Sequence, residues 1–379
     1  MKKKLFLEDY VYVCNALKKH PVLLEKVNKI SFHDLCQKLQ TTVLGYNSLI
    51  DALTEITMFF HDGHTNIELP YTPEDMCINL PCKWRKEQLV LDGKYMDIPV
   101  GAEVISVESK NVLELLSWAS TRVPHENTYL VKSRITEYPY KNYHLFSEMN
   151  LTKLFGKKKA YSIRFRVNGV CIEKQCLMEK YNGFLNFSQK PFVSYEIKEN
   201  TLVLHLRECI CNEEYKNTLR YVAKLCKEKN LHSLELDLSE NMGGNSQVID
   251  EFIRFTHADT YHRYEMIDFS SGSPVCVTSR ESVVKNDKYD ILFPEKIFCR
   301  VSNTTFSSAR TFATTLKDNG IATIIGEPTG GKPCSYGMPK RDVTPNFNIR
   351  FRISRALFLR PDKELEKDEA LFPDTYKFF

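Results

Sequence analysis

The sequence has 379 residues, enough for two or three domains with a sizeable buried core. Hydrophobic residues make up 42% of the chain, and its 52 basic side chains nearly balance 48 acidic ones. This composition is typical of a globular protein, and the lack of a long basic block argues against a nucleic-acid partner. No stretch approaches the ~20 apolar residues of a membrane span. Glu8 and Asp9 interrupt the apolar part of the N-terminus, so we predict no signal peptide.

The twelve cysteines do not follow the spacing of a metal site or a disulfide framework. The closest pairs are Cys209/Cys211, Cys77/Cys82 and Cys171/Cys176, and C-x-x-C does not occur. We therefore expect buried apolar cysteines and free thiols, and neither a metal nor an organic cofactor. Free thiols in this number suit a reducing compartment, which predicts a cytoplasmic protein, or an extracytoplasmic one if a leader preceding this sequence has been removed.

The first half of the chain changes from helical to strand-like patterns. Residues 5–58 carry apolar side chains at three- and four-residue spacing, which predicts helices, with Ser31 as an N-cap and Asp34 in the following turn. Gly63 then indicates a turn into a strand. Residues 69–190 contain short alternating segments and one helical stretch at 111–120, which indicates a small β-rich domain with one or two helices.

From residue 191 to the end, strand-like and helical patterns alternate. Strands are expected at 201–206, 231–238, 296–302 and 322–327, and helices at 212–230, 246–256 and 307–320. The first of these helices should bury Leu219, Val222, Ala223 and Cys226 on one face. This alternation is the signature of βαβ crossovers, so we predict an α/β domain with a largely parallel sheet.

Two loops of this α/β part end a strand and precede a helix, where such folds place their sites. In residues 236–246, the glycines Gly243 and Gly244 allow a close backbone approach to a ligand. In residues 301–313, Ser307 and Ser308 open a helix. A serine there is usually a helix cap, but the same position lets the first turn stabilise an alkoxide and an oxyanion.

A third loop, residues 324–337, is also glycine-rich and presents Lys332 between Gly331 and Pro333. A lysine in such a loop is usually only exposed. To act as a base near neutral pH, its pKa must fall by about three units through burial or a cationic neighbour. Ser–Lys hydrolases make use of that change.

In this order, the three loops closely resemble the tail-specific or C-terminal processing peptidases, a family that includes the tricorn core and the retinoid-binding repeats. The family motifs D-L-R-x-N-x-G-G, T-x-S-A-x-E-x-F-A and I-G-E-x-T-x-G-K are similar to residues 237–244, 305–313 and 325–332. The resemblance implies Ser307 as the nucleophile and Lys332, twenty-five residues later, as its base. Two positions depart from the motifs: Ser239 replaces an arginine and Arg310 replaces a glutamate.

The resemblance also extends to D-G-H-T, residues 62–65, which looks like the segment from which some members supply a histidine near the nucleophile. His64 is therefore a second candidate base, and its chemistry needs no large pKa change. The oxyanion hole would comprise the backbone N–H of Ser308 and that of Gly243 or Gly244. The base remains open between Lys332 and His64 at this point.

The sequence patterns divide the chain into a helical region at 1–68, a β-rich domain at 69–190 and a catalytic α/β domain at 191–379. Residues 97–116 resemble part of a PDZ domain, and the family resemblance implies a ClpP/crotonase-like fold for the catalytic domain. The expected function is a serine-type endopeptidase that acts on polypeptides, with strand addition of a substrate chain end to the PDZ-like part. The alternatives are a non-catalytic binding protein on the same fold and a crotonase-type enzyme for coenzyme A thioesters. The sequence does not indicate an oligomeric state.

Overall fold

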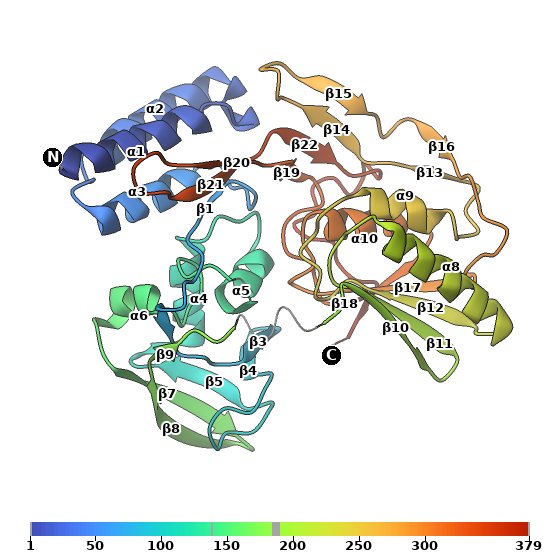
Figure 1. Cartoon of the computed structure of the whole chain (residues 1–379), viewed down its shortest axis with the longest axis horizontal. Coiled ribbons are helices and arrows are strands. Elements are labelled where there is room, and N and C mark those ends of the chain that lie inside the picture. The colour runs from blue at the N-terminus through green and yellow to red at the C-terminus, as the bar shows by residue number, and fades with distance from the viewer. Residues whose placement is uncertain (1, 138, 184–189, 378–379) are drawn as a thin grey trace. The chain divides into compact units, whose positions relative to one another are not determined.

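A computed structural model describes residues 2–137, 139–183 and 190–377 (Figure 1). The chain folds into two compact units, Met1–Lys190 with Pro339–Ser354, and Pro191–Met338 with Arg355–Phe379. The predicted division into three parts placed 339–354 in the catalytic domain, whereas this segment lies in the first unit. None of the helices described is both long and apolar enough to cross a membrane.

The first unit combines helices with several β-sheets, the largest of which has six strands. The helices are α1 (Lys2–Leu17), the 3₁₀ helix η1 (Pro21–Leu24), α2 (Lys26–Gln40), α3 (Tyr46–Met58), α4 (Val112–Ser120), α5 (Thr128–Glu137) and α6 (Glu148–Phe155). The strands are β1 (Asn66–Glu68), β2 (Met76–Cys77), β3 (Cys82–Arg85), β4 (Gln88–Leu91), β5 (Glu103–Val107), β6 (Lys110–Asn111), β7 (Ala160–Val167), β8 (Val170–Leu177), β9 (Glu179–Lys180), β20 (Lys340–Val343) and β21 (Arg350–Ile353).

The helical start of the chain is confirmed, but two details of the prediction are wrong. Ser31 does not cap a helix, because α2 begins five residues earlier at Lys26 and Ser31 lies inside it. The residue preceding α2 is Glu25, whose side chain makes no capping hydrogen bond, so the sequence carries no capping signal there. The described residues of the β-rich segment contain three helices, α4, α5 and α6, rather than one or two.

The segment 339–354 belongs to the first unit because it pairs with residues far away in sequence. Strand β21 runs antiparallel to β1, with Ile67 opposite Phe351, and also pairs with β20. The buried carboxylate of Asp9 in α1 accepts hydrogen bonds from the backbone N–H groups of Asn346 and Phe347 at 3.0 and 2.9 Å. Phe351 is thereby buried in the core of α1, α2 and α3.

The second unit is built on a six-stranded sheet of order β10-β11-β12-β17-β18-β23. Its helices are α8 (Glu213–Glu228), α9 (Gln247–Ile253) and α10 (Ser308–Asp318). Its strands are β10 (Val193–Lys198), β11 (Thr201–Leu206), β12 (Ser233–Asp237), β13 (Thr260–His262), β14 (Glu265–Asp268), β15 (Val275–Thr278), β16 (Val283–Lys285), β17 (Lys296–Val301), β18 (Thr323–Gly326), β19 (Ser335–Gly337), β22 (Ala356–Leu359) and β23 (Thr375–Tyr376).

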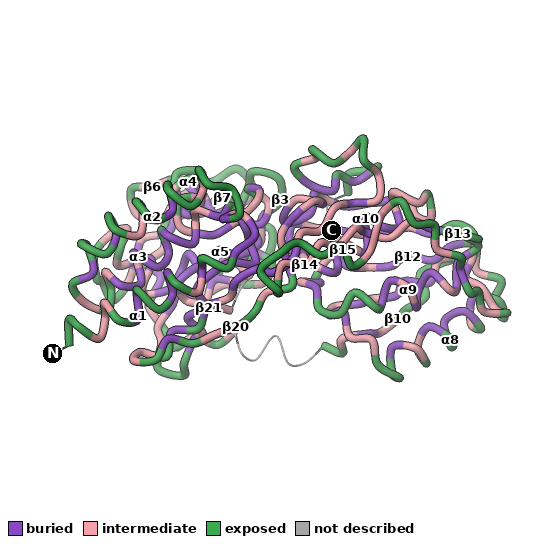
Figure 2. The backbone as a smooth tube through the Cα atoms, turned by 90° about the horizontal axis from the view of Figure 1, so that it is seen from above, coloured by how far each residue is buried: buried purple, intermediate pink, exposed green. Residues whose placement is uncertain are grey.

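The four predicted strands, β11, β12, β17 and β18, form the expected parallel sheet. Strand β23 adds a further parallel strand at one edge, and β10 adds an antiparallel strand at the other. Helices α8, α9 and α10 lie on one side of this sheet (Figure 1). Asn212 caps α8 by accepting from the N–H of Tyr215 at 2.9 Å, and the predicted face of Leu219, Val222, Ala223 and Cys226 is buried. Buried and exposed stretches consequently alternate along α8 in Figure 2. The unit also contains a smaller sheet of order β15-β14-β22-β19 and the antiparallel pair β13-β16.

All twelve cysteines are free thiols, and seven of them are buried. The prediction of thiols that behave as small apolar side chains is therefore confirmed for most of them.

Candidate active site

The three predicted loops follow three neighbouring parallel strands of the second unit. Strand β17 pairs with β12 on one side and β18 on the other. The loop from 238 to 246 follows β12, the loop from 302 to 307 follows β17, and the loop from 327 to 334 follows β18. Because the carboxyl ends of parallel strands meet at one edge of a sheet, the loops gather at the place where α/β folds bind ligands.

Ser307 immediately precedes α10 and has an unusual backbone conformation. Its φ is 53° and its ψ is −128°, outside the regions that residues with a side chain normally adopt. Such a conformation costs on the order of 1–3 kcal/mol and persists only where the surroundings hold it. Strain of this kind concentrates at functional sites, and a sharp turn between a strand and a helix is the place for an exposed nucleophile.

Hydrogen bonds between two loops hold Ser307 in this conformation. The N–H of Phe306 donates to the carbonyl of Asn241 at 3.1 Å. The hydroxyl of Thr305, which is fully buried, donates to the carbonyl of Leu238 at 2.8 Å. On the helix side, the N–H of Thr311 donates to the carbonyl of Ser307 at 2.9 Å. Residues on both sides of Ser307 are therefore fixed.

Gly243 lies directly against the nucleophile candidate. A β-carbon added to Gly243 would lie 2.6 Å from the Cβ of Ser307 and 3.0 Å from the backbone nitrogen of Ser308. The φ angle of Gly243 is +108° and that of Gly244 is +137°, values that favour glycine. The sequence pattern of two adjacent glycines thus has a steric cause, because no side chain fits between this loop and Ser307.

The backbone N–H groups around Ser307 are not equivalent. The N–H of Gly243 donates to the side-chain oxygen of Asn241 at 2.8 Å, so this group is used inside its own loop. Across the three described segments of the chain, the N–H groups of Gly244 and Ser308 have no acceptor. Ser308 is the first residue of α10, where the helix dipole favours negative charge.

The hydroxyl of Ser308 has structural partners that distinguish it from Ser307. It donates to the carbonyl of Gly244 at 2.7 Å and lies 2.9 Å from the hydroxyl of Ser246. The side chain of Ser308 therefore joins the start of α10 to the glycine loop.

Lys332 forms an ion pair with Glu369 in the same unit. Its Nζ lies 2.8 Å from one carboxylate oxygen and 2.9 Å from the other, and the two side chains are 36% and 63% exposed. A general base must present a neutral amine, whereas this partner and this exposure suit an ammonium group.

His64 belongs to the first unit, where a buried carboxylate fixes its position. The backbone N–H of His64 donates to Asp62 Oδ1 at 2.8 Å, and its Nδ1 lies 3.7 Å from the same oxygen. The other oxygen accepts from the hydroxyl of Ser354 at 2.6 Å and lies 3.1 Å from His20 Nε2. In the tautomer with the proton on Nδ1, the nitrogen nearest this carboxylate, Nε2 is the basic nitrogen of the imidazole.

Asp62 is ionised in this environment. Burial raises its pKa, but the hydrogen bonds with His20 and His64 outweigh burial and hold the pKa well below its usual range. The sequence indicated His64, but it did not indicate the role of Asp62 or of His20, which is 42 residues away from Asp62. The D-x-H spacing was the available signal, since an aspartate two residues before a histidine can accept from its N–H.

One group of side chains in the described segments could coordinate a metal ion. Ligand atoms of Asp62, His64 and Glu126 lie within 4.8 Å of one another, and all three belong to the first unit. Imidazole and carboxylate ligands are those that zinc accepts. The sequence reasoning did not bring Glu126 together with the D-x-H segment.

Comparisons with known proteins point to a peptidase family. Residues 200–374 match the model of peptidase family S41. Mature CPAF has a similar structure, with a TM-score of 0.71 and 13% identity over 99% of this chain and 92% of that one. Mature CPAF complexed with lactacystin gives a TM-score of 0.67 with 13% identity, over 99% and 94% of the two chains. The photosystem II D1 C-terminal processing protease gives 0.51 with 14% identity, over 99% and 93%.

The match to this family model bears on three expectations from the sequence. The chain is a hydrolase, specifically a serine-type peptidase. Its class as a mixed α/β protein is confirmed as well, and the solved structures share this fold over nearly their whole length. Peptides or polypeptides are its substrates.

Proposed function

We propose that this peptidase cleaves peptide bonds with Ser307 as the nucleophile. The observation that carries the proposal is the strained backbone of Ser307, held at the start of α10 against Gly243. The hydroxyl oxygen attacks the carbonyl carbon of the scissile bond, and the hydroxyl proton goes to a base. The carbonyl oxygen becomes an oxyanion, and its collapse breaks the C–N bond while the base gives the proton to the leaving amine. Water, deprotonated by the same base, then hydrolyses the acyl–serine ester and restores the hydroxyl.

The oxyanion hole in this proposal comprises the N–H groups of Ser308 and Gly244. Both have no other acceptor in the segments that the structure describes, and they lie on either side of the contact between Ser307 and Gly243. The Gly243 N–H contributes indirectly, because its hydrogen bond to Asn241 fixes the loop. The removal of one oxyanion donor typically lowers kcat by about 10²–10³-fold.

His64 is the base that we favour over Lys332. Its support is the buried Asp62 carboxylate, which accepts from the backbone N–H of His64 and lies 3.7 Å from its Nδ1, while Lys332 is paired with Glu369. The proposal requires His64 to serve Ser307 in the working enzyme.

Peptide hydrolysis by single variants tests these roles. We expect Ser307→Ala to abolish turnover and His64→Ala to lower kcat/KM by at least about 100-fold. Ser233→Ala, which removes a buried hydroxyl at the start of β12, and Lys317→Ala, which breaks the 2.7 Å ion pair with Asp374, are the matched controls. Lys332→Ala should behave like Lys317→Ala. If Lys332→Ala abolishes turnover and His64→Ala does not, Lys332 is the base.

The finer features of the first unit also remain proposals. We propose that the sheet of order β3-β4-β5-β7-β8 with α4 acts as a PDZ-like module that binds substrate chain ends by strand addition. Amidation of the C-terminal carboxylate of a peptide substrate should then raise KM.

We also propose a cytoplasmic location, supported by twelve free thiols of which Cys171 and Cys276 are exposed. Fractionation of the native cells tests this location.

A further inference from the structure

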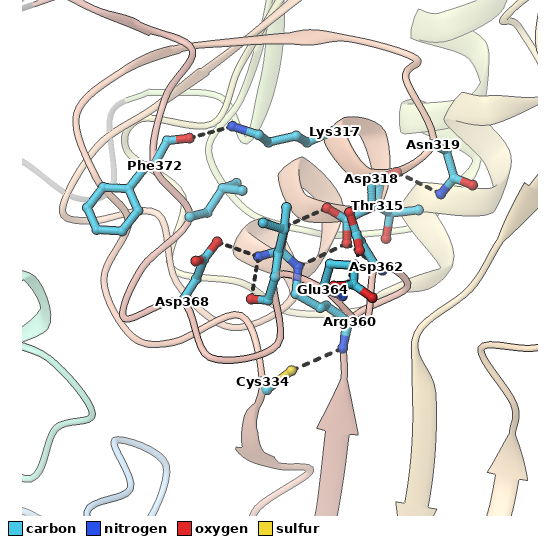
Figure 3. A network of polar contacts seen from close by, with 12 residues as sticks. Thr315, Lys317, Asp318, Asn319, Cys334, Arg360, Asp362, Glu364, Asp368 and Phe372 are labelled. Atoms are coloured by element: carbon cyan, nitrogen blue, oxygen red, sulfur yellow. Dashed lines mark hydrogen bonds and ion pairs between the residues drawn. The ribbon is translucent and has the colours of Figure 1, made fainter.

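Two arginine side chains are almost completely buried in the second unit, and their surroundings differ. Arg360, which follows β22, has 0% exposure, and Arg310 in α10 has 2%. Figure 3 shows the partners of Arg360: its Nη2 and Nε donate to the carboxylate of Asp318 at 2.5 and 3.0 Å. Its Nη1 donates to Asp368 at 2.9 Å. Arg360 is thus compensated by carboxylates, as a buried cation requires.

Arg310 has no such compensation. Its Nη2 donates to the hydroxyl of Ser335 at 2.6 Å, and its guanidinium carbon lies 5.5 Å from the ring centre of Phe306. Its Nε and Nη1 are buried and have no hydrogen-bond partner within the described segments. No carboxylate of those segments lies within the 4.0 Å of an ion pair. A buried charge left in this condition costs several kcal/mol.

Other buried hydroxyl groups surround Arg310. Thr314 lies one helical turn after Arg310 on the same face of α10, and its hydroxyl has no partner among the described residues. The hydroxyl of Tyr264 is in the same condition. Burial raises the pKa of Tyr264, while the charge of Arg310 and a weak hydrogen bond with the Thr314 hydroxyl, too long or too bent for ordinary hydrogen-bond geometry, lower it. Tyr264 is 6% exposed and Thr314 is fully buried.

We propose that Arg310, Tyr264, Thr314 and Ser335 bind one small monovalent anion with the size and charge of chloride. The guanidinium supplies one positive charge and two donor nitrogens without a partner, Nε and Nη1, and each hydroxyl can add a donor. A water molecule would satisfy donors but would leave the charge uncompensated. The near-complete burial of all four side chains suits an inorganic ion rather than a substrate carboxylate on a peptide chain. This site goes beyond the peptidase chemistry and does not depend on it.

Crystallography with bromide in place of chloride tests the site directly. Crystals of the full chain grown in sodium bromide should give an anomalous peak within hydrogen-bond distance of Nε or Nη1 of Arg310. Arg360 provides the internal control, because its carboxylate partners exclude an anion. The absence of a peak at Arg310, with an ordered water in its place, would overturn the proposal.

Thermal unfolding tests the same site in solution. The Tm of the full chain should be higher in sodium chloride than in sodium gluconate at equal ionic strength, because an ion that binds only the folded state stabilises it. Thr314→Val should require about tenfold more chloride for the same shift, since a hydrogen bond to a charged group is lost. Thr315→Val is the matched control, because the Thr315 hydroxyl already donates to the Thr311 carbonyl at 2.8 Å.

The remaining variants separate the anion site from catalysis. Arg310→Met should abolish the difference in Tm between chloride and gluconate, and Ser307→Ala should keep it in full. An equal Tm of the unmodified chain in the two salts, or an equal response of Thr314→Val and Thr315→Val, refutes the anion site. The Thr314 comparison remains decisive even if Arg310→Met does not fold.

Discussion

Replacement of Gly243 by alanine is the sharpest test of the packing around the nucleophile. The new β-carbon would lie 2.6 Å from the Cβ of Ser307, 3.0 Å from the nitrogen of Ser308 and 3.1 Å from the carbonyl oxygen of Phe306. The last two are backbone atoms, so the start of α10 must move. This movement would displace the Ser308 N–H, which is a proposed oxyanion donor, and would also shift the hydroxyl of Ser307.

Two effects add up in the stability of Gly243→Ala. A side chain at φ +108° costs roughly 1–2 kcal/mol, by analogy with the left-handed region. The forced contacts add about 1–3 kcal/mol, the usual range for overpacking. We therefore expect the free energy of unfolding to fall by about 2–5 kcal/mol, and kcat/KM to fall at least about 100-fold.

Gly272→Ala is the matched control for this change. Gly272 has a φ of +89°, yet a β-carbon there would have no atom within 4 Å. The control therefore measures the backbone cost of about 1–2 kcal/mol alone and should leave activity unchanged. Urea unfolding and peptide hydrolysis measured on both variants decide the question. Equal losses of stability with full activity in Gly243→Ala would refute the proposed arrangement around Ser307.

Three further variants test the supporting polar groups. Burial raises the pKa of Asp237, but hydrogen bonds with His205 and Ser239 lower it to about 2 from 3.8, which corresponds to about 2 kcal/mol. Because this pKa is depressed, the stabilisation is present above pH 3.8 and is lost towards pH 2. In urea unfolding, Asp237→Asn should therefore have a lower free energy of unfolding than the unmodified chain at pH 7, and this difference should disappear in acid. Asn241→Ala removes the 2.8 Å bonds to Gly243 and Leu206 and should cost about 2–3 kcal/mol in the same assay. In peptide hydrolysis, Asp62→Asn should lower kcat and change KM little, because it removes the carboxylate beside His64. An unchanged kcat would show that Asp62 does not position His64 for catalysis.

Local patterns predicted the elements of the parallel sheet and its three loops, because each strand and helix there carries its own apolar periodicity. The helix of Leu219, Val222, Ala223 and Cys226 is an example, since all four side chains are buried as the pattern indicates. Helix α5 was missed because its buried residues include Lys132 and Arg134, whose partners are remote backbone carbonyls and Glu87.

Features that depend on distant pairing were not predictable from the sequence. The pairing of β1 with β21 joins residues that are more than 280 positions apart, and it takes 339–354 into the first unit. The positive φ of Ser307 likewise arises from hydrogen bonds to the preceding strand's loop, which no local pattern records. Family motifs indicated Ser307, but they did not indicate why the neighbouring glycine is required.

The central claim is that the Ser307 hydroxyl is the nucleophile, and covalent labelling tests it most directly. Treatment with a fluorophosphonate followed by trypsin releases residues 301–310, which contain three serines and two threonines. Fragment-ion mass spectrometry should locate one adduct on Ser307, and labelling should disappear in Ser307→Ala but persist in Ser233→Ala. An adduct on Ser308 or outside this peptide, or peptide hydrolysis retained by Ser307→Ala, would contradict the account.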